Sequence, residues 1–172
     1  MKPNYRFLSY ILFAIGVALL TGTVLFYLHF SQPAPVNLTD NTPQMLADLP
    51  LVHIITGQEA IDSIHQLYGE DFPLDDGIVA IYGNQNVILW VSDAGSVANA
   101  SDLIVRMKAR ITEGDSPFVE SGNIELNGVV VYVVEGMGQK QYYWQAGKLV
   151  LWLAADNSIA QKAIAECVAF YK

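Results

Sequence analysis

The stretch Gly136–Ala155, GMGQKQYYWQAGKLVLWLAA, contains two apolar runs with Ala146-Gly147 between them. Two apolar runs joined by a short glycine turn predict an antiparallel β-hairpin. Side chains alternate between the two faces of a strand, so the consecutive aromatic residues Tyr142 and Tyr143 must point to opposite faces. The stretch therefore predicts two strands of a sheet rather than a single aromatic binding box.

A turn at Ala146-Gly147 also predicts the register of this hairpin. It pairs Tyr142 with Leu151 on one face of the sheet. The next pair, Tyr143 with Val150, lies on the opposite face. Both faces of the predicted sheet are apolar, whereas an antiparallel sheet normally exposes one polar face to solvent. Three helices could cover one face fully or both faces partly.

Two arrangements explain the second apolar face. If helices cover both faces, the aromatic residues are part of the core. If all helices pack on one side, the rings of Trp90, Tyr143 and Trp152 form an open apolar surface of the kind that binds a partner or a second copy of the chain. These three residues are candidate binding residues, and the sequence leaves both arrangements open.

Gly136, Met137 and Gly138 form the loop that precedes the hairpin. Glycine permits positive φ and close approach of the backbone, as tight turns require. A dinucleotide-binding fingerprint needs a third glycine and a following helix, but here the chain enters a strand. We therefore expect no cofactor at this loop, and we include its three residues among the candidate binding residues as neighbours of the sheet.

Outward from this stretch, the chain alternates helical and β patterns. Apolar spacing and flanking glycines predict three helices, over 56–69, 96–113 and 158–172. Short apolar runs predict strands, over 77–83, 86–92, 129–136, 140–145 and 148–155, with a shorter one at 123–126. The fold class is therefore α+β, with element order α–ββ–α–βββ–α and a mainly antiparallel sheet.

An internal similarity supports this order. Residues 87–99, VILWVSDAGSVAN, align with residues 149–161, LVLWLAADNSIAQ, and the alignment places Trp90 on Trp152 and Ser96 on Ser158. Each copy consists of the end of a predicted hairpin and the start of a helix. The similarity indicates either an ancient ββα duplication or a coincidence within a small α+β fold.

Residues 7–30, FLSYILFAIGVALLTGTVLFYLHF, contain no Asp, Glu, Lys or Arg. A helix of this length extends about 36 Å, which is enough to cross the ~30 Å hydrocarbon core of a bilayer. A cleaved signal peptide is the alternative, but its apolar region is usually only about 7–15 residues long. Lys2 and Arg6 precede the run, and the positive-inside rule then places residues 1–6 in the cytoplasm. We predict a single-pass signal anchor in the cell membrane.

Residues 31–50 contain four of the seven prolines and predict a semi-extended linker, followed by an extracytoplasmic domain at 51–172. All seventeen acidic residues and seven of the nine Lys and Arg follow the apolar run, so this part has a formal charge of −10. Such a surface repels phosphate backbones, which argues against a nucleic-acid partner. The expected partners are the membrane, through residues 7–30, and a protein or a second copy of the chain.

Catalytic motifs do not stand out. The sequence has no nucleophile elbow, P-loop or HExxH motif. His65 could pair with Asp62 on the first helix, but no third metal ligand can be placed, so we predict no metal site. The acidic segment 70–76, EDFPLDD, lacks the spacing of an EF-hand loop. Cys167 is the only cysteine, so no intramolecular disulfide can form.

The sequence thus favours a non-catalytic, membrane-anchored extracytoplasmic module that binds a partner through its sheet face and neighbouring loops. Two alternatives from other classes stay open. One is an extracytoplasmic hydrolase that uses acidic residues of the segment 70–76, and the other is a structural subunit of an envelope complex. No cofactor and no catalytic residue are predicted.

Overall fold

The computed structural model describes residues 38–171. The predicted cytoplasmic segment 1–6, the transmembrane helix at 7–30 and the linker as far as residue 37 lie outside the described residues. Within residues 38–171, no helix combines the length and the apolar character that crossing a bilayer requires.

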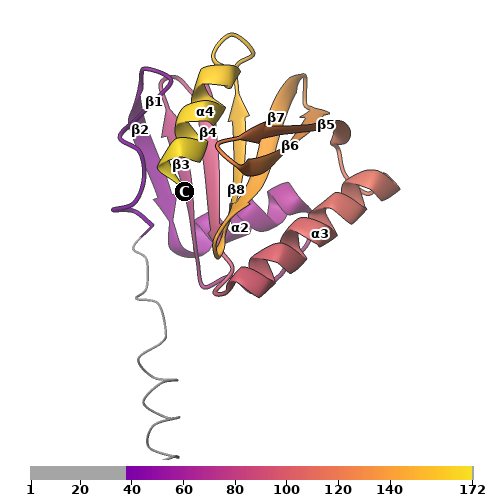
Figure 1. Cartoon of the computed structure of the whole chain (residues 1–172). Coiled ribbons are helices and arrows are strands. Elements are labelled where there is room, and N and C mark those ends of the chain that lie inside the picture. The colour runs from indigo at the N-terminus through magenta and orange to yellow at the C-terminus, as the bar shows by residue number, and fades with distance from the viewer. Residues whose placement is uncertain (1–37, 172) are drawn as a thin grey trace, which may run out of the picture. The chain divides into compact units, whose positions relative to one another are not determined.

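The described residues form an α+β domain with three helices and one antiparallel sheet of eight strands (Figure 1). The helices are α2 (Gly57–Tyr68), α3 (Val97–Glu113) and α4 (Ala160–Phe170). The strands are β1 (Met45–Leu46), β2 (Leu49–Thr56), β3 (Asp76–Tyr82), β4 (Val87–Asp93), β5 (Val119–Leu126), β6 (Val129–Gly136), β7 (Gln139–Ala146) and β8 (Leu149–Ala155). Their order in the sheet is β1-β2-β3-β4-β8-β7-β6-β5, so β4 and β8 lie at its centre.

The strands at both edges of the sheet extend beyond the sequence prediction. At one edge, β1 and β2 lie within or next to the segment expected to be a linker, and Leu38 and Leu46 are 0% and 1% exposed. The hydroxyl of Tyr82 donates to the Pro43 carbonyl at 2.9 Å, which ties this segment to the sheet. The packed domain therefore includes residues 38–50. At the other edge, β5 has eight residues instead of the short strand expected at 123–126.

Helices cover both faces of the sheet. One face carries α2 and α3, and the other carries α4, which lies in front of the sheet in Figure 1. The core on the first face joins buried side chains of both helices to β6, β7 and β8, among them Ile64, Met107, Tyr143 and Trp152. Of the two arrangements that the sequence left open, the structure therefore has the one with helices on both faces.

Most helix ends lie where capping residues in the sequence predict them. Gly69 and Gly114 end α2 and α3 with left-handed φ angles of 70° and 84°. The Ser96 hydroxyl accepts the Asn99 N–H at 3.1 Å and caps α3. The expected Ser158 cap is absent, because α4 begins later and the Asp156 carbonyl accepts N–H groups at the start of α4 instead.

The register of the β7–β8 hairpin differs from the sequence prediction. Tyr142 pairs with Leu153 and Tyr143 pairs with Trp152, because the turn closes at Gly147-Lys148 rather than at Ala146-Gly147. Gly147 has a φ of 60°, as the first central position of a type II′ turn requires. The difference shifts the pairing by two residues, so each side chain keeps its predicted face.

The β3–β4 and β7–β8 hairpins lie side by side in the sheet, because β4 pairs with β8. Trp90 lies directly opposite Trp152, and Leu89 and Val91 lie opposite Leu153 and Leu151. The pairing is therefore symmetric about the two tryptophans, which the internal similarity also aligns. The symmetry does not include the helices, because α3 and α4 cover opposite faces of the sheet.

A buried ion pair joins the end of β4 to the β7–β8 turn. The Lys148 Nζ lies 2.7 Å from the Asp93 Oδ2, and the two side chains are 17% and 4% exposed. The other Asp93 oxygen accepts the Gly95 N–H at 2.9 Å. We expect Lys148→Met to lower the free energy of unfolding in urea by about 3 kcal/mol, because it leaves a buried carboxylate without its partner.

The control for this prediction is Lys162→Met, which removes the exposed pair of Lys162 with Asp48 and should have a much smaller effect. The double variant Asp93→Asn/Lys148→Met should recover part of the lost stability, since it removes the unpaired charge. Equal effects of the Lys148 and Lys162 variants would contradict this account.

Candidate functional site

A row of aromatic side chains crosses the middle of the sheet. Tyr132, Tyr143, Trp152 and Trp90 are direct cross-strand neighbours on β6, β7, β8 and β4. The rings of Tyr132 and Tyr143 stack with centroids 4.9 Å apart, and those of Tyr143 and Trp152 stack at 5.2 Å. Both distances match the spacing of neighbouring strands, so the sheet itself sets the stacking.

The structure brings the candidate residues Trp90, Tyr143 and Trp152 together in this row, and α2 and α3 cover it. Tyr143 is 1% exposed and Trp152 is 2% exposed, while Trp90 is partly buried. The Trp90 indole donates to the Ser63 hydroxyl of α2 at 3.2 Å. Of the two arrangements that the sequence allowed, the structure has the covered one, and these rings belong to the core instead of an open sheet face.

The other three candidate residues form an exposed turn. Met137 and Gly138 connect β6 to β7, and their φ angles of 55° and 82° are typical of a type I′ turn. Gly136 pairs with Gln139 as the last residues of the two strands. The Met137 side chain is 77% exposed at the tip of the turn.

The two glycines of this turn serve different purposes. A Cβ at Gly136 would lie 2.4 Å from the Phe118 ring and 2.9 Å from the Pro117 carbonyl oxygen. A Cβ at Gly138 would contact nothing within 4 Å, but it would be held at a φ of 82°. Gly136 thus allows a close approach of the chain, and Gly138 allows a left-handed conformation.

We expect Gly136→Ala to lower the free energy of unfolding by about 1–3 kcal/mol, because the added methyl group overpacks the contact with Phe118. Gly138→Ala should lower it by about 1 kcal/mol through backbone strain alone. Thermal and urea unfolding of the two variants provide the measurement. A larger loss at Gly138 than at Gly136 would contradict the assigned roles.

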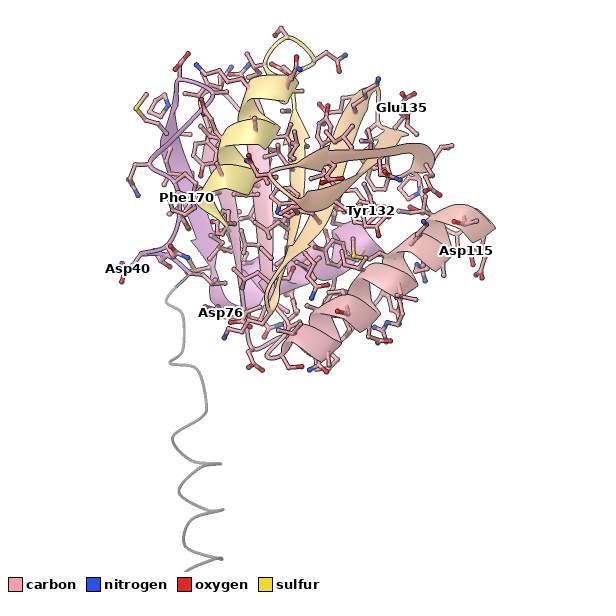
Figure 2. The ribbon with its side chains drawn as sticks, in the orientation of Figure 1. Asp40, Asp76, Asp115, Tyr132, Glu135 and Phe170 are labelled. Atoms are coloured by element: carbon pink, nitrogen blue, oxygen red, sulfur yellow. The ribbon has the colours of Figure 1, made fainter. Side chains whose placement is uncertain are left out.

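This turn forms one wall of a groove on the face of the sheet that carries α4. The volume of the groove is about 860 Å³. Its lining residues come from the β6–β7 hairpin and from the start of α4, and they are Glu135, Gly136, Gly138, Gln139, Lys140, Tyr142, Asn157, Ala160 and Gln161. Glu135 is labelled at the end of the hairpin in Figure 2. Two of the six candidate residues, Gly136 and Gly138, therefore line the groove.

Tyr142 is the aromatic residue in the lining. It is 8% exposed, and its hydroxyl has no hydrogen-bond partner among the described residues. Burial raises the pKa of this hydroxyl above its ordinary value, so it is a neutral donor and acceptor at physiological pH. The hydroxyl oxygen is not among the buried polar atoms of the described residues that lack a partner, so it is open to water or to a molecule in the groove.

The opposite wall of the groove supplies further polar groups without protein partners. Asn157 and Gln161 are exposed, and neither side chain makes a hydrogen bond within the described part of the chain. No side chain caps the start of α4, but the N–H groups of Ala160 and Ala163 already donate to the Asp156 and Ile159 carbonyls, so the side-chain amides are the groups that face the groove. This wall therefore offers both donors and acceptors to a molecule in the groove.

The two charged residues of the groove form a weak pair. The Lys140 Nζ lies 3.8 Å from the Glu135 Oε1, and both side chains are about half exposed. The Glu135 carboxylate also accepts the Ser121 hydroxyl at 3.1 Å. The lining thus contains one positive and one negative side chain, in contrast to the acidic surplus of the whole chain.

A separate pocket lies at the end of α2, where Glu70 and Asp71 of the acidic segment join His65 in the lining. His65 lies there between the Asp71 carboxylate, 3.4 Å from its Nδ1, and the Phe72 carbonyl, 2.9 Å from its Nε2. Asp62, the partner expected for His65, instead accepts the Gln58 amide at 2.8 Å. The described residues include no group of three His, Cys, Asp or Glu side chains that could hold a metal ion.

Cys167 is buried in α4. Its exposure is 0%, and burial raises the pKa of its thiol. A thiol with a raised pKa is a poor nucleophile at neutral pH because little thiolate is present. Its position agrees with the packed role that its apolar sequence neighbours indicate.

The sequence predicted that the turn at Gly136–Gly138 lies near a binding site, but it did not predict the groove between this turn and the start of α4. Asn157 and Gln161 lie near the start of α4, distant in sequence from Tyr142, and only the covering of the second face by α4 brings them to the β6–β7 hairpin. One signal was available: the alternation that assigned Tyr142 and Tyr143 to opposite faces. It shows that Tyr142 must face α4 if Tyr143 faces the other helices.

No known family model matches the chain, and no curated protein or solved structure is similar enough to count as a match.

Proposed function

We propose that the chain is a non-catalytic binding module, and that its site is the groove between the β6–β7 hairpin and the start of α4. The Tyr142 hydroxyl, which makes no hydrogen bond within the described residues and lies open at the groove, is the observation that carries the proposal. A polar group that faces a concave site and has no partner in the surrounding protein can hydrogen-bond to a bound molecule. The uncommitted side chains of Asn157 and Gln161 support the same conclusion.

The experiment is site-specific photo-crosslinking in cells that produce the full chain. A photoreactive residue at position 161, in the groove, is compared with one at position 66, where Gln66 is also exposed on a helix but lies outside the groove. The proposal expects a discrete adduct at position 161 that Asn157→Ala weakens. The same adducts at both positions, or none at 161, would show that the groove is not a binding site.

We further propose that the domain is extracytoplasmic and tethered to the cell membrane by residues 7–30. The support is the length of this apolar run and the position of Lys2 and Arg6 before it. Protease added to spheroplasts or intact cells should then cleave the domain, and the mature protein should keep its N-terminal residues. A protected domain, or a mature N-terminus after Phe30, would exclude the tether.

An internal duplication is the third part of the proposal. The symmetric pairing of β4 with β8 about Trp90 and Trp152 supports a common origin of the two hairpins. Because α3 and α4 cover opposite faces, the helix that follows each hairpin would have changed sides. The duplication is therefore proposed for the hairpins, and it bears on the origin of the fold rather than on the site.

A further inference from the structure

We infer that the ligand of the groove is an uncharged oligosaccharide. The inference rests on the proposed function, since it names the class of molecule that the same site takes. It follows from three properties of the lining: its charge, the kind of hydrogen-bonding groups it presents, and the position of its strands within the sheet.

The charge of the lining favours an uncharged ligand. Glu135 and Lys140 have opposite charges and lie 3.8 Å apart, so their fields largely cancel for a molecule in the groove. A strongly anionic ligand would be close to the Glu135 carboxylate, and a strongly cationic one would be close to Lys140. Neither sign of charge is clearly preferred by the pair.

The hydrogen-bonding groups favour a ligand that is rich in hydroxyl groups. The Tyr142 hydroxyl both donates and accepts, and the amides of Asn157 and Gln161 each present a donor beside an acceptor. Every hydroxyl of a sugar likewise donates and accepts, so neighbouring sugar hydroxyls can pair with each of these groups. An apolar ligand would cover the Tyr142 hydroxyl and leave it without a partner.

The position of the strands argues against an extended peptide. Peptides that bind to sheets usually add a strand to a free edge, where main-chain groups are unpaired. The groove lies over β6 and β7, and each of these strands is already paired on both sides. The groove therefore offers side chains rather than a strand edge, and its volume of about 860 Å³ leaves room for a short oligosaccharide.

The test is calorimetric titration of the full chain in lipid nanodiscs, because glycoside detergents would compete for the site. The probes are maltotriose, cellotriose and the trimer of N-acetylglucosamine, with a trimer of galacturonic acid as the charged comparison. We expect at least one uncharged trimer to bind more tightly than the charged one. Tyr142→Phe should weaken that binding by about 3- to 10-fold, as the loss of one neutral hydrogen bond predicts.

Tyr142→Phe is a clean variant because its hydroxyl has no partner in the described protein, so its thermal midpoint should stay unchanged. Asn157→Ala/Gln161→Ala should abolish measurable binding. The matched control Asn123→Ala/Gln66→Ala changes the same two residue types at exposed positions outside the groove, and it should bind like the wild type.

Three results would overturn the inference: no binding of any uncharged trimer at millimolar concentration, tighter binding of the charged trimer, or equal binding by the groove variants and the wild type. The crosslinking experiment separates the two proposals. If position 161 gives a specific adduct while no uncharged trimer binds, the groove is a binding site for another class of ligand. If both experiments fail, the proposed function fails with the inference.

Discussion

Trp152→Ala is expected to lower the free energy of unfolding by about 3–5 kcal/mol, the range for large aromatic residues removed from a core. Trp152 is 2% exposed, and its ring lies 4.9 Å from Phe118 and 5.2 Å from Tyr143. Its indole N–H donates to the Gln141 side-chain oxygen at 2.5 Å. Because Gln141 is itself only 2% exposed, the variant also leaves a buried amide without its donor.

Urea unfolding, followed by circular dichroism, measures the effect. Trp90→Ala is the matched control, because Trp90 lies opposite Trp152 in the sheet but is only partly buried. It should lose about half as much stability or less, since less apolar area is removed from the core. A loss below about 1 kcal/mol for Trp152→Ala, with an unchanged dependence on urea, would contradict the assignment of this ring to the core.

Raising the pH above about 10 is expected to destabilise the domain steeply. Burial raises the pKa of the hydroxyls of Tyr68, Tyr82, Tyr143 and Tyr171 above their ordinary value. In the unfolded chain these groups lose their protons near pH 10, while in the folded chain they keep them. The unfolded state then binds fewer protons, so the free energy of unfolding falls as the pH rises.

The size of this effect follows from the number of buried tyrosines. Each one contributes a slope of about 1.4 kcal/mol per pH unit over the range in which only the unfolded state is ionised. The contribution of these groups is fully present below the pKa of the unfolded chain and is lost above it. Cys167, whose pKa burial also raises, adds the loss from one further group, and this loss begins at a lower pH.

Urea unfolding between pH 8 and about pH 11 tests this prediction. Tyr82→Phe removes one of the four hydroxyls, so it should reduce the slope above pH 10 by about 1.4 kcal/mol per unit. The variant also loses the hydrogen bond to the Pro43 carbonyl and should be about 1 kcal/mol less stable at neutral pH. A free energy of unfolding that stays constant from pH 9 to pH 11 would show that these hydroxyls are not buried.

Much of the fold was predictable from local patterns. The helices ended by Gly69 and Gly114 follow from apolar spacing and from glycine in the left-handed conformation, both of which are properties of short segments. The faces of the β7–β8 hairpin follow from the two-residue period of a strand, and they survive a register shift of two. The candidate site was only partly predictable: the sequence singled out the turn of Gly136 and Gly138 but missed Tyr142, Asn157 and Gln161.

By itself, the sequence determined that both faces of the sheet are apolar, because alternating apolar residues occupy both sides of the same strands, but it left open whether helices cover both faces. Only the tertiary structure decided which helix covers which face. A helix can pack on either side of a sheet, and its own periodicity shows which of its residues are buried but not where the helix lies. The placement of α2 and α3 over Trp90, Tyr143 and Trp152 put these rings in the core, and the placement of α4 on the opposite face made the groove beside Tyr142.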